Sequence, residues 1–498
     1  MTIAITDVHP NFKLQDKELL CQTGWINGEP AKATSGEDPF PVYDPANDSV
    51  WAYQESMGVD ETKAAIAAAD AAFPAWSKTP PRVRARLLLS LDTQIRAARE
   101  DLAILIVMET GKALVEAYAE VDYAAQYSWL MAGECERIAG EVIKNGDNAG
   151  LRYIITHQAI GPVGLLCPWN FPVVIALRKI TTALAAGCTV VVKPSPETPV
   201  TTSSLAILCK RAGIPDGVVN VVTASTQSTP VVGQTLCEDP RIKKISFTGS
   251  TPVGKLLMKQ SSSTLKKMTL ELGGNGAFIV FDDADLERAT DALVANKFRA
   301  AGQVCMCANR VMVHSSLVDE FAALMKTKIE QLKFGHGLDK GITNGPLTTL
   351  RGAERAVELI EDAVKNGGKL LLGGKRFGSG YHLEPTLIVG AARTSRTFCE
   401  EMFAPICAIY PFETEDEVIE VVNDTNMGLT NYVFTTNLSR AFRVTDALES
   451  GTVAVNTPMA NAAESPFGGT KESGFGSEGG IKYGVEEFCT VKAMALAL

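Results

Sequence analysis

The sequence predicts an α/β protein, because short strand-like runs alternate with helical segments in its middle third. The runs are apolar, rich in β-branched residues and bounded by polar or turn-forming residues. The expected strands are 163–167, 188–193, 218–222 and 243–247, and the expected helices are 172–186, 200–212 and a segment after Pro252. This alternation is typical of βαβ units with a parallel sheet, which binds ligands at the carboxyl ends of its strands.

The flanking regions are predicted to be helical before this unit and α/β after it. Four earlier stretches have helical apolar spacing and carry no evident chemistry, so we expect them to pack. They are 60–76, 83–99, 102–107 and 113–139. A strand at 277–281 begins a second α/β region that reaches about Gly469, and the tail after Ile481 ends in an apolar run suited to a strand. The length of 498 residues is enough for two or three domains.

Composition excludes several classes of partner. The net charge of −10 and the pI near 5.3 argue against nucleic acid or an anionic membrane surface. No uncharged apolar stretch reaches the roughly 18 residues that a membrane span needs. The five histidines are dispersed and no paired Cys-x-x-Cys motif occurs, so we expect no metal site. A small-molecule substrate is therefore the expected partner.

The cysteines and the N-terminus indicate the compartment. Eleven cysteines, an odd number, are scattered without the spacing of a disulfide framework, which is typical of free thiols in a reducing compartment. Residues 1–20 mix acidic and basic side chains and resemble neither a signal peptide nor a transit peptide. We expect the protein to be cytoplasmic.

One cysteine stands out as a candidate nucleophile. Cys305 follows a Gly-Gln turn, and Gly302 permits the close backbone approach that a thiol at the floor of a cleft requires. Two upstream stretches supply complementary groups: Asn170 in Pro168-Trp-Asn-Phe-Pro172 offers an amide, and Glu271 in Leu270-Glu-Leu-Gly-Gly274 offers a carboxylate. A glutamate between two leucines is unusual for a plain strand and is a weak signal of a site.

Five motifs together resemble the aldehyde dehydrogenase superfamily in order and spacing, from about Trp25 to the C-terminus. They are Pro168-Trp-Asn-Phe-Pro172, Phe247-Thr-Gly-Ser-Thr-Pro-Val-Gly254, Glu271-Leu-Gly-Gly274, Phe298-Arg-Ala-Ala-Gly-Gln-Val-Cys305 and Pro466-Phe-Gly-Gly469. The resemblance implies a Rossmann-like coenzyme domain, an α/β catalytic domain and a small β oligomerisation arm. We expect the coenzyme domain at 1–140 and 160–271, the catalytic domain at 272–470, and the arm and tail at 141–159 and 471–498. Such arms serve dimers or tetramers, so we expect a homodimer or a homotetramer.

The resemblance also implies catalytic roles. Cys305 would attack the aldehyde carbon as a thiolate, and the Asn170 side chain with the Cys305 backbone N–H would stabilise the oxyanion. Glu271 would activate the water that hydrolyses the thioester. Lys179 would act in a proton relay, but Thr490 stands where many relatives have a glutamate, which predicts another route for the proton.

Coenzyme contacts follow from the same resemblance. A glycine-containing turn after a strand lets backbone N–H groups approach a pyrophosphate at a helix N-terminus. The implied contacts are Trp169, Lys193, Ser195, Gly249, Ser250, Glu401 and Phe403. Relatives that prefer NAD tend to carry a glutamate three residues after this lysine, where Pro196 stands here. We therefore expect NADP or use of both coenzymes, while Glu197 keeps NAD open.

Substrate choice is predicted to depend on two arginines. Arg178 and Arg299 match the positions at which succinate-semialdehyde dehydrogenases bind a carboxylate, and Asn461 replaces the usual serine. Succinate semialdehyde is the first expectation, and glutarate semialdehyde, 2-oxoglutarate semialdehyde or a neutral aldehyde are alternatives. Two other classes stay open, a thiol acyl-transferase or hydrolase without nicotinamide and a non-catalytic scaffold.

A second thiol lies two residues from the nucleophile. Cys307 could form a reversible disulfide with Cys305 that silences the enzyme under oxidation, or it could simply be packed. A bridge between residues i and i+2 is strained unless the loop rearranges.

Overall fold

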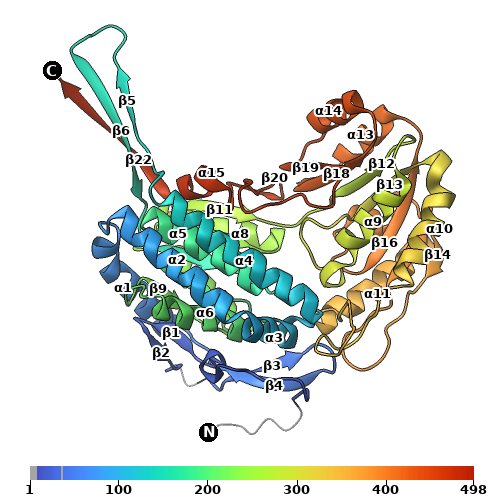
Figure 1. Ribbon diagram of the computed structural model, residues 1–498, viewed down its shortest axis with the longest axis horizontal. Coiled ribbons are helices and arrows are strands. Elements are labelled where there is room, and N and C mark those ends of the chain that lie inside the picture. The colour runs from blue at the N-terminus through green and yellow to red at the C-terminus, as the bar shows by residue number, and fades with distance from the viewer. Residues whose placement is uncertain (1–7, 35–36) are drawn as a thin grey trace.

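The computed structural model describes residues 8–34 and 37–498, whose strands form two large, mainly parallel sheets, one three-stranded antiparallel sheet and two antiparallel strand pairs (Figure 1). The predicted α/β class is confirmed. Residues 1–7 of the N-terminal segment discussed above lie outside the described part. Within that part, no helix is both long and apolar enough to cross a bilayer.

The first sheet has the order β2-β1-β9-β8-β7-β10-β11-β21, and its five strands from β9 to β11 are parallel. Its strands are β1 Gly24–Ile26, β2 Glu29–Ala31, β7 Val163–Leu166, β8 Val190–Lys193, β9 Val219–Val221, β10 Lys244–Thr248, β11 Lys267–Glu271 and β21 Gly474–Phe475. The four strands predicted for the βαβ unit lie within one or two residues of β7, β8, β9 and β10. Val190 and Val192 face one core layer and Val191 the other, since successive side chains of a strand point to opposite faces.

Helices cover both faces of this sheet. One layer contains α2 to α6, and the opposite layer contains α1, α7 and α8. Their bounds are α1 Val59–Trp76, α2 Pro81–Ala97, α3 Arg99–Thr110, α4 Leu114–Glu134, α5 Pro172–Ala186, α6 Pro199–Arg211, α7 Thr229–Glu238 and α8 Thr251–Ser261. A separate hairpin pairs β3 Phe40–Asp44 with β4 Ser49–Gln54.

The second sheet has the order β14-β15-β16-β13-β12-β18-β19 and is parallel except for β14. Its strands are β12 Ala277–Val280, β13 Arg310–His314, β14 Lys369–Leu372, β15 Thr386–Val389, β16 Ile406–Phe412, β18 Thr430–Phe434 and β19 Thr452–Val455. Its helices are α9 Leu286–Lys297, α10 Val318–Ile329, α11 Leu350–Lys365, α12 Arg396–Cys399, α13 Glu415–Asn423 and α14 Leu438–Ala447. The two-residue strands β17 Met427–Gly428 and β20 Thr470–Lys471 pair with each other beside it.

The small sheet projects from the body as an arm (Figure 1). It pairs β6 Leu151–Ala159 with β5 Glu141–Lys144 on one side and β22 Cys489–Ala497 on the other. The strand expected for the apolar end of the tail is confirmed as β22. The first part of the tail forms helix α15 Ile481–Glu486, which was not predicted and which packs against α4 and α5. The predicted domain boundaries stay a prediction.

Candidate active site

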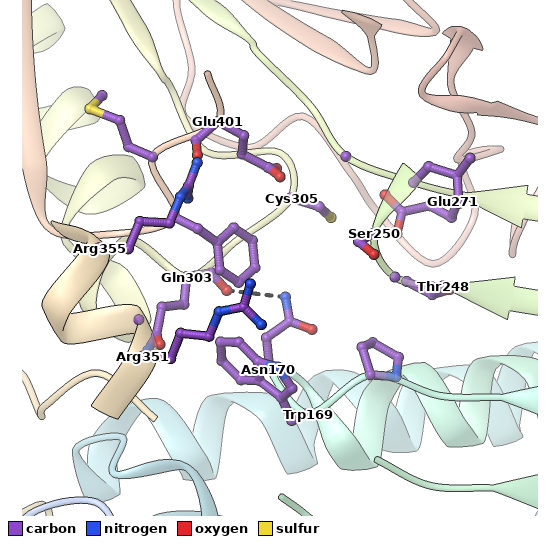
Figure 2. Close-up of a pocket in the computed structure, with 17 residues that line it drawn as sticks. Trp169, Asn170, Thr248, Ser250, Glu271, Gln303, Cys305, Arg351, Arg355 and Glu401 are labelled. Atoms are coloured by element: carbon purple, nitrogen blue, oxygen red, sulfur yellow. Dashed lines mark hydrogen bonds between the residues drawn. The ribbon is translucent and has the colours of Figure 1, made fainter. Parts of the chain in front are cut away.

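The candidate site lies where parallel strands of the first sheet end. β7 leads into the loop that carries Asn170, β10 ends before Gly249, and β11 ends on Glu271 itself. Carboxyl ends of parallel strands lie at one edge of a sheet, so these groups come together although they are far apart in the sequence. The second sheet contributes Cys305 through the loop between α9 and β13 (Figure 2).

A cavity of about 400 Å³ joins most of the predicted residues. The predicted residues that line it are Trp169, Asn170, Gly249, Ser250, Glu271, Cys305, Glu401 and Phe403. Six predicted residues do not line it, namely Arg178, Lys179, Lys193, Ser195, Arg299 and Asn461. Figure 2 shows Cys305 between Glu401 and Glu271.

The nucleophile loop has a strained backbone. The 3₁₀ segment Arg299–Gly302 contains three successive left-handed residues, Ala300 with φ 48°, Ala301 with φ 52° and Gly302 with φ 74°. A Cβ on Gly302 would lie 2.2 Å from the Ala404 carbonyl oxygen. The glycine therefore permits a close backbone approach, as expected from the sequence. Left-handed alanines cost of order 1–3 kcal/mol each and tend to occur at functional sites.

The amide of Asn170 is fixed by this loop. Its Nδ2 donates to the Gln303 carbonyl at 3.0 Å, and the Gln303 side chain is itself held by Ala300 O and Thr348 N. Asn170 Oδ1 is buried and has no hydrogen-bond partner among the residues that the structure describes. One Nδ2 hydrogen is therefore used to orient the amide, and the second can serve an oxyanion.

The acid–base properties of the pair Cys305 and Glu271 follow from burial. Burial raises the pKa of Glu271 to about 8, and its Oε1 has no hydrogen-bond partner within the described part of the chain. Burial and the nearby Glu271 charge raise the pKa of the Cys305 thiol well above its usual value. The resting thiol is therefore protonated, and it needs a base to become the nucleophile; Glu271 is the neighbouring base.

Groups suited to a nucleotide line the other side of the cavity. Ser250 is the N-cap residue of α8 and its side chain makes no capping bond, so the first N–H groups of that helix are available to an anion. Glu401 accepts from Gly274 N at 3.0 Å, and burial raises its pKa to about 7. Trp169 and Phe403 pack edge to face at 5.5 Å.

Lys193 and Ser195 lie at the end of β8, outside this cavity. Burial lowers the pKa of Lys193 to about 8, and its Nζ donates to the Pro194 carbonyl at 2.8 Å. Ser195 Oγ donates to Glu197. Glu197, the residue that kept NAD open as the coenzyme, is thus hydrogen-bonded to Ser195, a predicted coenzyme contact.

Because Thr490 stands where many relatives have a glutamate, the sequence predicted that Lys179 lacks a carboxylate partner. This prediction is wrong. Lys179 Nζ donates to Glu478, whereas Thr490 lies in the arm strand β22 and its hydroxyl donates to Gln158 O. Glu478 also pairs with Arg178 at 2.8 Å. Burial alone would raise the pKa of Glu478, but the charges of Lys179 and Arg178 outweigh it and hold the pKa below its usual value.

The predicted substrate contacts Arg178, Arg299 and Asn461 do not line the cavity. Arg178 is buried, and neither its Nε nor the buried Asn461 Oδ1 has a hydrogen-bond partner in residues 8–34 and 37–498. Arg299 is exposed, and its guanidinium lies 5.4 Å from the Phe171 ring centroid. Cys307 is buried with Sγ against the carbonyls of 296, 297 and 308, at 3.7 to 3.8 Å, which favours a packed thiol.

Residues 31–494 match the model of the aldehyde dehydrogenase family. The chain belongs to this family. The NADP(+) succinate-semialdehyde dehydrogenase 1 of Schizosaccharomyces pombe is 45% identical over 490 residues, covering 98% of this chain and 97% of the relative. The glutarate-semialdehyde dehydrogenase of Pseudomonas putida is 41% identical, covering 98% of this chain and all of the relative. The crystal structure of an E. coli NADP dependent enzyme superposes with a TM-score of 0.95 at 43% identity, over 98% of this chain and 100% of that one.

Four residues of this family member were missed by the sequence analysis. Gln303, Arg351 and Arg355 line the cavity, and Glu478 holds Lys179 and Arg178. Arg351 extends from the start of α11 toward Asn170 in Figure 2. The two arginines are one helical turn apart, but this spacing is also common on exposed helices, so the sequence alone did not single them out. Among the described residues, no group of histidine, cysteine or acidic side chains could hold a metal ion.

Proposed function

We propose that the protein oxidises succinate semialdehyde to succinate with NADP+, through a thioester on Cys305. The observation that supports this most directly is the facing pair of Cys305 and Glu271 in one cavity with the nucleotide-suited groups Ser250, Glu401 and Phe403. Membership of the aldehyde dehydrogenase family and the names of the relatives support the reaction and the coenzyme.

The cavity fits a nicotinamide coenzyme. The uncapped N-terminus of α8 would hold the pyrophosphate, and Glu401 with Phe403 would hold the nicotinamide ribose. A bound nicotinamide ring supplies the acceptor for the hydride that leaves the aldehyde carbon.

The chain's own groups account for the proton movements. Glu271 takes the thiol proton and Cys305 Sγ bonds to the aldehyde carbon, whose oxygen becomes an oxyanion. The free Asn170 Nδ2 hydrogen and the Cys305 backbone N–H stabilise that charge, each such donor being worth about 3–4 kcal/mol. After oxidation to the thioester, Glu271 releases the thiol proton to solvent and then removes a proton from water. The attack of that water displaces the Cys305 thiolate, which regains this proton from Glu271 as the acid is released.

The charged end of the substrate is proposed to bind Arg178 and Arg299, with Asn461 beside them. Within the described residues, Arg178 keeps an unpartnered Nε, whose N–H can donate to a carboxylate. The Asn461 amide can donate to it only through its NH2 group, since its oxygen is an acceptor. Glutarate semialdehyde is the alternative, because one relative of similar identity is named for it.

The test is the initial rate of nicotinamide reduction with succinate semialdehyde, glutarate semialdehyde and butanal, each with NAD and NADP. Arg299→Ala is the informative variant, because Arg299 is exposed and makes no ion pair within the described residues, whereas removing Arg178 would leave Glu478 short of a partner. We expect wild type to favour succinate semialdehyde with NADP and the variant to lose that advantage while butanal turns over as before.

The matched control is Arg288→Ala, which removes an exposed arginine from neighbouring helix α9. Equal rates for the acid aldehydes and butanal in wild type would refute the binding of the substrate carboxylate by Arg178 and Arg299. An absence of coenzyme-induced thermal stabilisation would favour a scaffold or a nicotinamide-independent thiol enzyme instead.

We also propose a homodimer or homotetramer built through the arm, and a cytoplasmic location. The arm leaves β5 and β22 with open edges and exposes apolar side chains, including Val142 and Met494. All eleven cysteines lie in the described residues and all are free thiols, which suits a reducing compartment.

A further inference from the structure

Helix α4 carries two carboxylates one turn apart that reach the two loops of the active site. Glu116 Oε1 accepts from Ala300 N at 2.7 Å, in the loop that carries Cys305. Glu120 Oε1 accepts from Val173 N at 2.9 Å, at the start of the helix that follows Asn170. α4 and α5 lie alongside each other (Figure 1).

The contact of Glu116 is to the first of the three left-handed residues in the nucleophile loop. Ala300 O in turn accepts from Gln303 N at 3.1 Å and from Gln303 Nε2 at 3.0 Å. Gln303 O then accepts from Asn170 Nδ2. A continuous series of hydrogen bonds thus runs from Glu116 through the Cys305 loop to the oxyanion donor.

Glu120 anchors the second loop, which carries Asn170, at the start of α5. The N-cap residue of α5, Phe171, supplies no side-chain cap, and Glu120 replaces it by accepting from Val173 N and, at 3.4 Å, from Val174 N. Lys112 pairs with Glu120, and its Nζ lies 3.7 Å from the Phe171 ring centroid. The carboxylate is therefore compensated as well as buried.

We propose that Glu116 is a positioning residue. It fixes the strained Ala300 backbone relative to the Asn170 loop, which Glu120 anchors. It thereby sets the geometry between Cys305 Sγ and the oxyanion donors. This inference rests on the proposed roles of Cys305 and Asn170. It predicts that activity depends on the length of the Glu116 side chain and not on its charge, because an amide oxygen can also accept from a backbone N–H.

The test compares Glu116→Gln, which keeps the reach, with Glu116→Asp, which keeps the charge but is one methylene shorter. We expect the Gln variant to stay within threefold of wild type in kcat and the Asp variant to fall at least tenfold, each with coenzyme KM changed less than threefold. The second readout is iodoacetamide alkylation of Cys305 without substrate or coenzyme, scored by mass spectrometry against the exposed Cys399 of the same molecule. We expect the ratio of the two alkylation rates to change severalfold in the Asp variant only.

Glu109→Gln and Glu109→Asp are the matched controls. Glu109 is also a buried carboxylate, and it accepts from Val200 N at 2.7 Å and Thr201 N at 3.0 Å at the start of α6, which does not belong to the Cys305 loop. We expect these variants to lower Tm without moving the alkylation ratio. The inference is overturned if the two Glu116 variants behave alike, if the Gln variant is the worse one, or if the ratio follows Tm across all four variants. Because alkylation needs no aldehyde, a wrong substrate would leave this readout valid.

Discussion

At the scale of single residues, the pKa of Glu271 makes a prediction about pH. Burial raises this pKa to about 8, so the carboxyl is protonated and cannot act as a base at lower pH. We expect kcat to rise with pH and level off above about 8. Glu271→Gln should lose about 10²- to 10⁴-fold in kcat and lose this pH dependence, because the amide accepts no proton. The measurement is steady-state kcat from pH 6.5 to 9.5.

Coenzyme choice also depends on single residues near the end of β8. Pro196→Glu restores a carboxylate three residues after Lys193, where it would face a 2′-phosphate. We expect kcat/KM for NADP to fall tenfold or more, which corresponds to about 1.4 kcal/mol of repulsion, while the value for NAD changes little. Pro196→Gln is the uncharged control. If Gln and Glu have the same effect on NADP, the loop conformation rather than charge decides coenzyme choice.

The sequence located site residues well where a local motif marks them and poorly where only the fold does. Cys305, Glu271 and Asn170 each stand in a short recognisable motif, and all three line one cavity. Glu478 was missed because its partner Lys179 is 299 residues away in the chain and no local pattern connects them. The alignment of Thr490 with the partner position failed for the same reason.

At the scale of elements, the nucleophile loop predicts a specific sensitivity to a methyl group. In Gly302→Ala the new Cβ would lie 2.2 Å from Ala404 O at a φ of 74°, so strain and a steric clash add. Gly341→Ala is the control, since Gly341 has a φ of 83° but open space around its Cβ. We expect the control to lose about 1 kcal/mol of unfolding free energy. Gly302→Ala should lose more and most of the activity, measured by denaturant unfolding and initial rates; equal losses in both would contradict the clash.

Helices were predicted correctly where a proline or a glycine in the sequence marks both of their ends. The helix expected at 172–186 is α5, because Pro172 suits the first helical position and Gly187 ends the helix with a φ of 94°. The helix expected to reach 139 ends at Glu134, and its C-cap Cys135 is right-handed, so no left-handed glycine marks this end. Helix α15 was missed because its six residues are too few for a periodic pattern.

At the scale of the whole molecule, the cavity depends on how the two sheets meet. Asn170 and Glu271 come from the first sheet, whereas Cys305, Arg351 and Glu401 come from loops and a helix of the second. Periodicity predicts each sheet separately, but it carries no information about their relative placement. This is why the sequence did not single out Arg351 and Arg355, which line the cavity.

The arm makes a prediction about assembly. Val142, Ile154 and Met494 are directly opposite one another on three neighbouring strands, so they form one apolar row across one face of the sheet. Val142 is 67% and Met494 50% exposed, which is costly for apolar side chains unless another subunit covers them. We expect the double variant Val142→Asp with Met494→Asp to dissociate toward the 53.2 kDa single chain by light scattering, because burying two carboxylates without partners is unfavourable. Leu438→Asp, at a 72% exposed position on the body, should leave the mass of the assembly unchanged. A wild-type protein that already has the mass of one chain would show that the arm has a different role.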